Sequence, residues 1–220
     1  MTLTPRNVLT ELQNLLDYAI NSGIAIFANP VRVTGSTISW HPYNSSGRFL
    51  LERQVSNTSA YRHWLDTGEF TAMLLDGSLL QISYEVAGGD LVGHRLAYIP
   101  APFDWDPELL VTEPFVEVFD MYADGHTSTV MMNTQVRFDF DPINSRAGHP
   151  AAHFTINGPD CRIPCAAPVR IGQFAGFVVR NFYPTIWRDH SYFRRLPKSG
   201  WGRKTISDEE QGVPHLSWRL

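Results

Sequence analysis

The sequence lacks the short motifs that mark the common nucleotide-binding and hydrolytic enzymes. It contains no phosphate-binding glycine loop, no GxSxG nucleophile elbow, no HExxH zinc motif and no dinucleotide-binding fingerprint. These absences argue against nucleotide hydrolysis by a P-loop and against conventional hydrolase chemistry.

Cysteine and long apolar runs are also scarce. The two cysteines among 220 residues do not suggest a disulfide framework, so a reduced setting is expected. No apolar run approaches the roughly 20 residues that a membrane-spanning helix needs, and the N-terminus lacks the charged-then-apolar pattern of a signal peptide. We therefore predict a cytoplasmic protein that makes no contact with a membrane.

A strong excess of charge of one sign is absent as well. The formal net charge is −4, which provides no overall basic surface for nucleic acid. A local basic patch remains open, because six cations fall close together near the end of the chain: Arg188, Arg194, Arg195, Lys198, Arg203 and Lys204. Aromatic residues are interleaved with them, a mixture used both for single-stranded nucleic acid and for protein interfaces.

The clearest pattern that is present predicts a meander of three antiparallel strands. Residues 79–86 alternate between apolar and polar side chains, as a half-buried strand does. Asp76-Gly77 supplies a hairpin turn before this strand, and Gly88-Gly89 supplies another after it. Residues 70–75 and 91–99 are the flanking strands, and Pro100 ends the last one because proline donates no backbone hydrogen bond.

The rest of the chain alternates between short helices and short strands. Thr4-Pro5 begins a helix that Ser22-Gly23 ends, and further helices are predicted over 56–67, 115–122 and 168–183. Strands are predicted over 24–27, 31–40, 49–54, 128–141, 154–156 and 161–165.

Together these elements predict an α+β fold in a single domain over residues 1–188. The domain contains an antiparallel sheet of about six strands, an N-terminal helix, a short middle helix and a helix near 168–183. With 220 residues, 43% of them hydrophobic, the chain can bury one substantial core. A basic, aromatic arm over 189–220 follows, and its composition is compatible with an ordered or a disordered segment.

One group of polar residues could carry chemistry. Arg137, Asp139 and Asp141 share one face of the 128–141 strand, and His149 and His153 follow in the next loop. A guanidinium, two carboxylates and two imidazoles are suited to acid–base work or to binding a divalent ion. The alternative is a solvated surface whose Arg–Asp pairs add little stability. It is favoured because strand faces that mix charged and other polar residues are common.

His94 and Arg95 form a second candidate site on the 91–99 strand. A guanidinium can bind phosphate or carboxylate groups through two parallel hydrogen bonds. The favoured alternative is a structural ion pair between Arg95 and Asp104 or Asp106, because a buried arginine needs a counter-charge.

A zinc site is a weaker alternative. His149, His153, Cys161 and Cys165 are suitable ligand types, but their spacing matches no common zinc module. The cysteines are interpreted instead as small buried hydrophobic residues. No metal and no cofactor is predicted.

Seven motifs in a fixed order carry a resemblance to a known family. They are Leu75-Asp76-Gly77-Ser78, Gln81-Ile82-Ser83-Tyr84, the run from His94 to Pro102, the run from Arg137 to Asp141, His149-Pro150 with His153, Arg162-Ile163-Pro164 and Asn181-Phe182-Tyr183. This order resembles a bacterial family catalogued as domain of unknown function 2290, most firmly over residues 68–183.

The resemblance brings no established activity. It implies only that Arg95, Arg137, Asp139, His149 and His153 belong to the family pattern, whereas the cysteines do not. A looser similarity is to small toxins of bacterial toxin–antitoxin pairs, which place an Asp-Gly-Ser hairpin before an Arg-aromatic-Asp strand and a histidine loop. That similarity is an analogy and does not establish function.

Two functional hypotheses follow. The first is a ribonuclease-like effector of a bacterial defence or toxin–antitoxin type system, independent of metal. His149 and His153 would be its general acid and base, with Arg137 and Asp139 completing the catalytic set. Its ligand-binding residues would be Arg95, His94 and Asp141.

The second hypothesis is a non-enzymatic partner-binding or regulatory subunit of a bacterial defence complex. The missing catalytic motifs, the acidic net charge and the aromatic tail favour it. The expected partners are therefore nucleic acid or another protein, and the sequence leaves the oligomeric state open.

Overall fold

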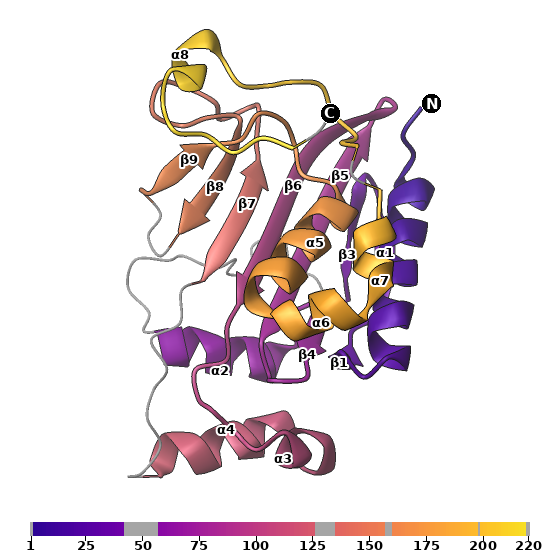
Figure 1. Ribbon diagram of the computed structural model, residues 1–220, viewed down its shortest axis with the longest axis vertical. Coiled ribbons are helices and arrows are strands. Elements are labelled where there is room, and N and C mark those ends of the chain that lie inside the picture. The colour runs from indigo at the N-terminus through magenta and orange to yellow at the C-terminus, as the bar shows by residue number, and fades with distance from the viewer. Residues whose placement is uncertain (1, 42–56, 126–134, 157–159, 198, 219–220) are drawn as a thin grey trace.

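The computed structural model describes residues 2–41, 57–125, 135–156, 160–197 and 199–218. The described strands form one sheet in which all pairings are antiparallel, in the order β1-β4-β5-β6-β7-β8-β9, with β2 and β3 attached beside β5 (Figure 1). Their bounds are β1 Ala25–Ala28, β2 Val31–Thr34, β3 Thr37–Trp40, β4 Ala72–Leu74, β5 Leu79–Ala87, β6 Asp90–Ile99, β7 Val136–Phe140, β8 Ala152–Ile156 and β9 Arg162–Pro164.

The α+β class and the antiparallel meander are confirmed, but the prediction of about six strands is wrong. The described residues form nine, because strands of only three or four residues join the sheet at its margins. The predicted strand over 31–40 is in fact a hairpin, since Gly35 takes a φ of +62° and turns the chain between β2 and β3. The predicted strand over 49–54 and the start of the one over 128–141 lie outside the described residues.

The described helices comprise the predicted ones and several that are too short for an apolar period to reveal them. Their bounds are α1 Pro5–Asn21, α2 Asn57–Thr67, α3 Pro107–Thr112, α4 Phe115–Asp124, α5 Ile171–Phe182, α6 Pro184–Asp189, α7 Ser191–Arg195 and α8 Asp208–Gln211. Helix α1 begins as predicted, with the side chain of Thr4 accepting a hydrogen bond from the backbone of Asn7. None of the helices in the described ranges is long and apolar enough to cross a membrane.

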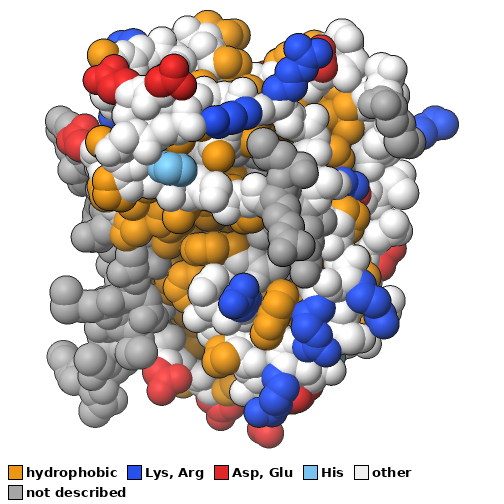
Figure 2. Space-filling view, turned by 45° about the horizontal axis from the view of Figure 1, so that its top comes forward, with side chains coloured by type: hydrophobic (Ala, Val, Ile, Leu, Met, Phe, Trp, Pro, Cys, Tyr) orange, Lys and Arg blue, Asp and Glu red, His pale blue; other side chains and the backbone are white. Residues whose placement is uncertain are grey.

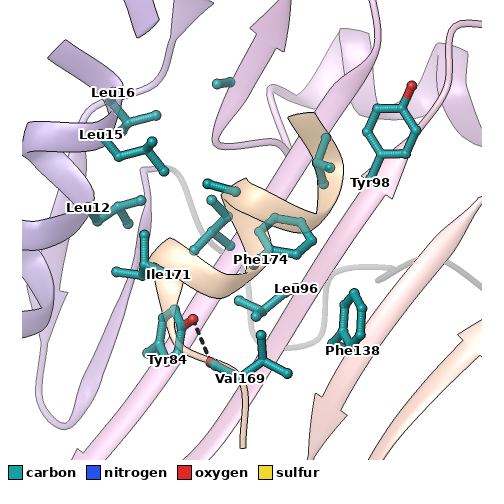
Figure 3. Packing of buried hydrophobic residues seen from close by; sticks show 14 of the residues in the cluster. Leu12, Leu15, Leu16, Tyr84, Leu96, Tyr98, Phe138, Val169, Ile171 and Phe174 are labelled. Atoms are coloured by element: carbon teal, nitrogen blue, oxygen red, sulfur yellow. Dashed lines mark hydrogen bonds between the residues drawn. The ribbon is translucent and has the colours of Figure 1, made fainter. Parts of the chain in front are cut away.

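One face of the sheet is covered by helices α1, α5, α6 and α7 (Figure 1). Leu12 of α1, Phe174 of α5 and Phe138 of β7 are fully buried in the main core (Figure 3). Tyr84 Oη of β5 donates a hydrogen bond of 2.9 Å to the carbonyl oxygen of Val169, just before α5. This bond ties the helix-bearing segment to the centre of the sheet.

The opposite face is divided along its length. At one end a second core packs under α2 and α4, and it contains Met73, Leu79, Ala97 and Ile99 of the sheet. Beyond this core the same face carries polar side chains. The end of the predicted arm is attached to the domain, because Leu216 donates a backbone hydrogen bond of 2.8 Å to Pro164 beside β9.

Candidate functional site

Strand register gathers several predicted site residues on the polar face of the sheet. Arg95 of β6, Asp139 of β7 and His153 of β8 lie opposite one another in a single row across three strands. Arg137 lies two residues before Asp139 and therefore on the same face. Val136, Phe138 and Phe140 of β7 belong to the main core on the helix-covered face, as the predicted alternation required, and Asp139 on the other face is buried as well.

Asp139 is the centre of an ion-pair network. Its Oδ2 atom lies 2.5 Å from Arg137 Nε and 3.4 Å from His153 Nε2. Burial by itself would raise the pKa of the Asp139 carboxyl, but the hydrogen bond with His153 and the charge of Arg137 hold that pKa below its usual value. Asp139 is therefore an ionised carboxylate, although it is only 6% exposed.

Both ring nitrogens of His153 face oxygen atoms. Nδ1 lies 2.9 Å from the carbonyl oxygen of Pro150, and Nε2 faces Asp139. The side chain is only 2% exposed. Since neither nitrogen points toward solvent, this arrangement suits a residue that holds the loop and orients Asp139 better than one that exchanges protons with a substrate.

His149 is the more accessible of the two predicted histidines. Its ring lies 5.0 Å from that of His153, and it is half-buried. Burial lowers the pKa of His149, and the positive charges of Arg162, His153 and Arg146 lower it further. Its imidazole is therefore neutral near pH 7, the state that can accept a proton.

The loop that presents His149 has a defined structure. Asn144 donates hydrogen bonds to both carboxylate oxygens of Asp141 at the end of β7, which forms a local turn. Arg146 and His149 then exchange backbone hydrogen bonds around Gly148, whose φ is +74°. Asp141 thus has a structural role in this turn.

A second row on the same face contains residues that sequence reasoning did not assign to the site. Thr155 of β8 lies between Arg137 of β7 and Arg162 of β9. Thr155 is 1% exposed, and its hydroxyl has no hydrogen-bond partner in the structure as described. The two-residue period of a strand, counted onward from His153, would have placed Thr155 on this face.

Arg95 and His94 are separated by the sheet. Arg95 is exposed and borders an open hollow of about 380 Å³ with Ser83, Glu85 and Asp141. His94 points to the helix-covered face, where its Nε2 accepts a hydrogen bond of 2.8 Å from the backbone of Val169. The two residues therefore cannot contact one ligand from the same side.

The predicted partners of Arg95 have other positions. Asp106 caps α3, where its carboxylate accepts a hydrogen bond of 2.9 Å from the backbone of Glu108. Asp104 is exposed beyond the end of β6. Across β6 and β7, the residue opposite Arg95 is Asp139.

The cysteines and the basic arm lie apart from this face. Cys165 is buried and Cys161 exposed, and the described ranges contain no cluster of three or more His, Cys, Asp or Glu side chains suited to a metal ion. The basic C-terminal helices pack on the opposite side of the sheet, through Phe193 and Trp187. Figure 2, turned by 45° from the view of Figure 1, shows Lys and Arg side chains in both its upper and its lower part.

A family model matches residues 25–218 of the chain, and the family is described as "Uncharacterized conserved protein (DUF2290)". Comparisons with curated proteins and with solved structures found no match, so they lend no support to the looser similarity with toxins. The family match covers most of the 220 residues. The chain belongs to this family.

Proposed function

We propose that this member of the DUF2290 family acts on nucleic acid as a ribonuclease-like effector, with the polar face of β6 to β9 as its binding surface. One observation carries the proposal. In two adjacent rows across these strands, Arg95, Arg137 and Arg162 share one face with the carboxylate of Asp139, while Glu85 and Asp141 border the hollow beside Arg95. In a protein with a net charge of −4, three guanidinium groups on one sheet face favour a ligand with several negative charges.

The individual groups suit a phosphodiester backbone. A guanidinium presents a planar set of donors that matches two phosphate oxygens. Arg95 is exposed and Arg162 is half-buried, so both lie near solvent.

His149 is the proposed proton acceptor. A neutral His149 would take the proton of a ribose 2′-hydroxyl, whose oxygen then forms a bond to the neighbouring phosphorus while the bond to the 5′ oxygen breaks. The imidazolium would return the proton to the departing 5′ oxygen. The products would be a 2′,3′-cyclic phosphate and a 5′-hydroxyl end, with Arg95 and Arg137 stabilising the phosphorane charge.

Binding is tested with fluorescently labelled single-stranded RNA and anisotropy. Arg95→Gln and Arg162→Gln are each expected to weaken binding and to reduce the slope of log affinity against log salt by about 0.7. Arg32→Gln is the matched control, because Arg32 is an exposed arginine on β2. Failure of the wild-type protein to bind RNA, or equal weakening by the control, would contradict the proposed surface.

Cleavage is tested separately. His149→Gln is expected to abolish cutting of single-stranded RNA while leaving binding nearly unchanged, because Gln cannot shuttle a proton. A substrate with 2′-deoxyribose throughout should be bound but not cut. Full cleavage by His149→Gln, or cleavage of the deoxy substrate, would show that the assigned chemistry is wrong.

A second candidate is a partner-binding subunit without catalysis. The observation that favours it is the closed network of Arg137, Asp139 and His153, in which both His153 nitrogens already face oxygen atoms. Under this alternative the wild-type protein neither binds nor cuts RNA, and it co-purifies from its native cell in stoichiometric complex with another protein.

A further inference from the structure

The turn between β4 and β5 is held by side chains from distant parts of the chain. Trp105 Nε1 donates a hydrogen bond of 2.7 Å to the carbonyl oxygen of Asp76, and Tyr61 Oη of α2 donates one of 2.5 Å to that of Gly77. Gly77 has a φ of +81°, and a Cβ atom there would collide with the indole of Trp105. The position of the turn is therefore tightly fixed.

In the part of the chain that the structure describes, the carboxylate of Asp76 accepts hydrogen bonds from neutral donors alone. Tyr183 Oη, at the end of α5, donates to its two oxygens over 2.8 and 3.0 Å, and the backbone of Ser78 donates over 3.0 Å. Tyr98 Oη lies 3.1 Å from Tyr183 Oη and extends the chain of hydroxyls. Among the residues that the structure describes, no Lys, Arg or His forms an ion pair with Asp76.

This carboxylate lies at the edge of an open hollow of about 370 Å³ with aromatic walls. Phe103, Trp105, Tyr98 and Phe182 line it, and Phe182 is 37% exposed at its rim. A second carboxylate, that of the exposed Asp104, also borders the hollow. Burial raises the pKa of Tyr183, and the negative charge of Asp76 raises it further.

We propose that this hollow, which we call the Asp76 pocket, binds an organic cation: an alkylammonium or guanidinium group. Aromatic faces attract such cations through their quadrupoles, and a carboxylate held by neutral donors supplies the missing counter-charge. Hydrogen bonds from Trp105 and Tyr61 hold the turn that carries Asp76, so little ordering is needed when a cation binds. The inference is independent of the proposed nucleic-acid function, because it concerns other residues and a ligand of opposite charge.

The indole N–H of Trp105 is a direct reporter, because it is bonded to the backbone of Asp76. Its signal in a ¹H–¹⁵N spectrum is assigned with Trp105→Phe and followed during titration with spermidine and, separately, with the tripeptide Gly-Arg-Gly. A saturable shift with the tripeptide alone identifies a basic side chain of a partner protein as the ligand. A saturable shift with spermidine alone identifies a polyamine, and a shift with both supports the shared chemistry.

Two variants and one control decide whether the cation is bound in the pocket. Asp76→Asn keeps the shape and the acceptor for Tyr183 but removes the charge, and it should weaken binding by about tenfold. Phe182→Leu removes one exposed ring and should weaken it by about threefold, which keeps the test informative if Asp76→Asn does not fold. Asp90→Asn makes the same charge change at the exposed β5–β6 turn and should leave affinity unchanged. No saturable shift with either probe, or equal weakening by Asp76→Asn and Asp90→Asn, would overturn the proposal.

Discussion

His94 and Arg95 follow each other on β6, yet their side chains reach opposite faces of the sheet and different surroundings. On the helix-covered face His94 is buried as a neutral ring that accepts a hydrogen bond from the backbone of Val169. On the polar face Asp139, opposite Arg95, is buried as an ion beside Arg137 and His153. The surroundings of His94 keep its ring neutral, whereas those of Asp139 compensate its charge. The comparison shows that one sheet uses both ways of burying titratable groups.

The largest expected effect comes from breaking the ion pairs of the polar face. Asp139→Ala should lower the free energy of unfolding by about 3–5 kcal/mol, because it removes the buried carboxylate that faces the Arg137 guanidinium and His153 Nε2. Urea unfolding measures this change. Asp90→Ala removes an exposed carboxylate and should change stability by less than about 0.5 kcal/mol. A similarly small effect of Asp139→Ala would show that the network adds nothing to the fold.

The helix-covered face should respond to acid instead. Burial lowers the pKa of His94 to about 4, against 6.5 for the exposed side chain, although the charge of Asp139 opposes this shift. The unfolded chain therefore binds the proton more tightly than the folded one. The stability that a neutral His94 provides is complete above pH 6.5 and is lost as the pH falls toward 4. Since a tenfold change in proton affinity corresponds to about 1.4 kcal/mol, the full loss is on the order of 3 kcal/mol.

His94→Gln isolates this contribution. Glutamine can still accept the hydrogen bond from Val169 but does not titrate, so the variant should lose less stability between pH 6.5 and pH 4 than the wild type does. The pKa of Asp139 lies below 3.8 in the folded state, so the stabilisation from its ion pairs falls only at lower pH. Urea unfolding across this range separates the two faces. Identical pH profiles for wild type and variant would contradict the assignment to His94.

The smallest expected effect concerns a single neutral hydrogen bond on the helix-covered face. Tyr84→Phe removes the bond to the carbonyl oxygen of Val169 and should cost about 1 kcal/mol, because that bond is buried. Tyr192→Phe is the matched control: its bond to the carbonyl oxygen of Asn14 is exposed, and its loss should cost only a few tenths of that amount. Thermal unfolding compares the two variants, and equal costs would show that burial does not strengthen the Tyr84 bond.

The course of several helices and strands could be predicted from residues close together in the sequence. The alternation of β7 placed Phe138 in the core and Asp139 on the other face. Thr4-Pro5 began α1 because the capping hydroxyl and the proline need no distant partner. The number of strands was underestimated, since strands of three or four residues have too few positions for a clear period.

The roles within the candidate site did not follow from such patterns. His149 and His153 are equivalent in the sequence, but the tertiary structure closes His153 between Pro150 and Asp139 and leaves His149 half-buried and neutral. Arg162 joined the site only through the pairing of β8 with β9, and Thr155 came to lie beside Arg137 through the pairing of β7 with β8. A residue's partners across strands depend on register, which a single segment does not specify.

The sequence by itself determined the α+β class, the central meander and the alternation of faces along β5 and β7, because these depend on short-range periodicity and turn chemistry. Only the tertiary structure decided which charges are compensated. It placed Arg137 and His153 beside Asp139 and, within the described ranges, gave Asp76 neutral donors alone, among them Tyr183, which is 107 positions away along the chain. The physical reason is that a charge is stabilised by whatever lies within a few ångströms of it, and packing sets those neighbours regardless of their distance in sequence.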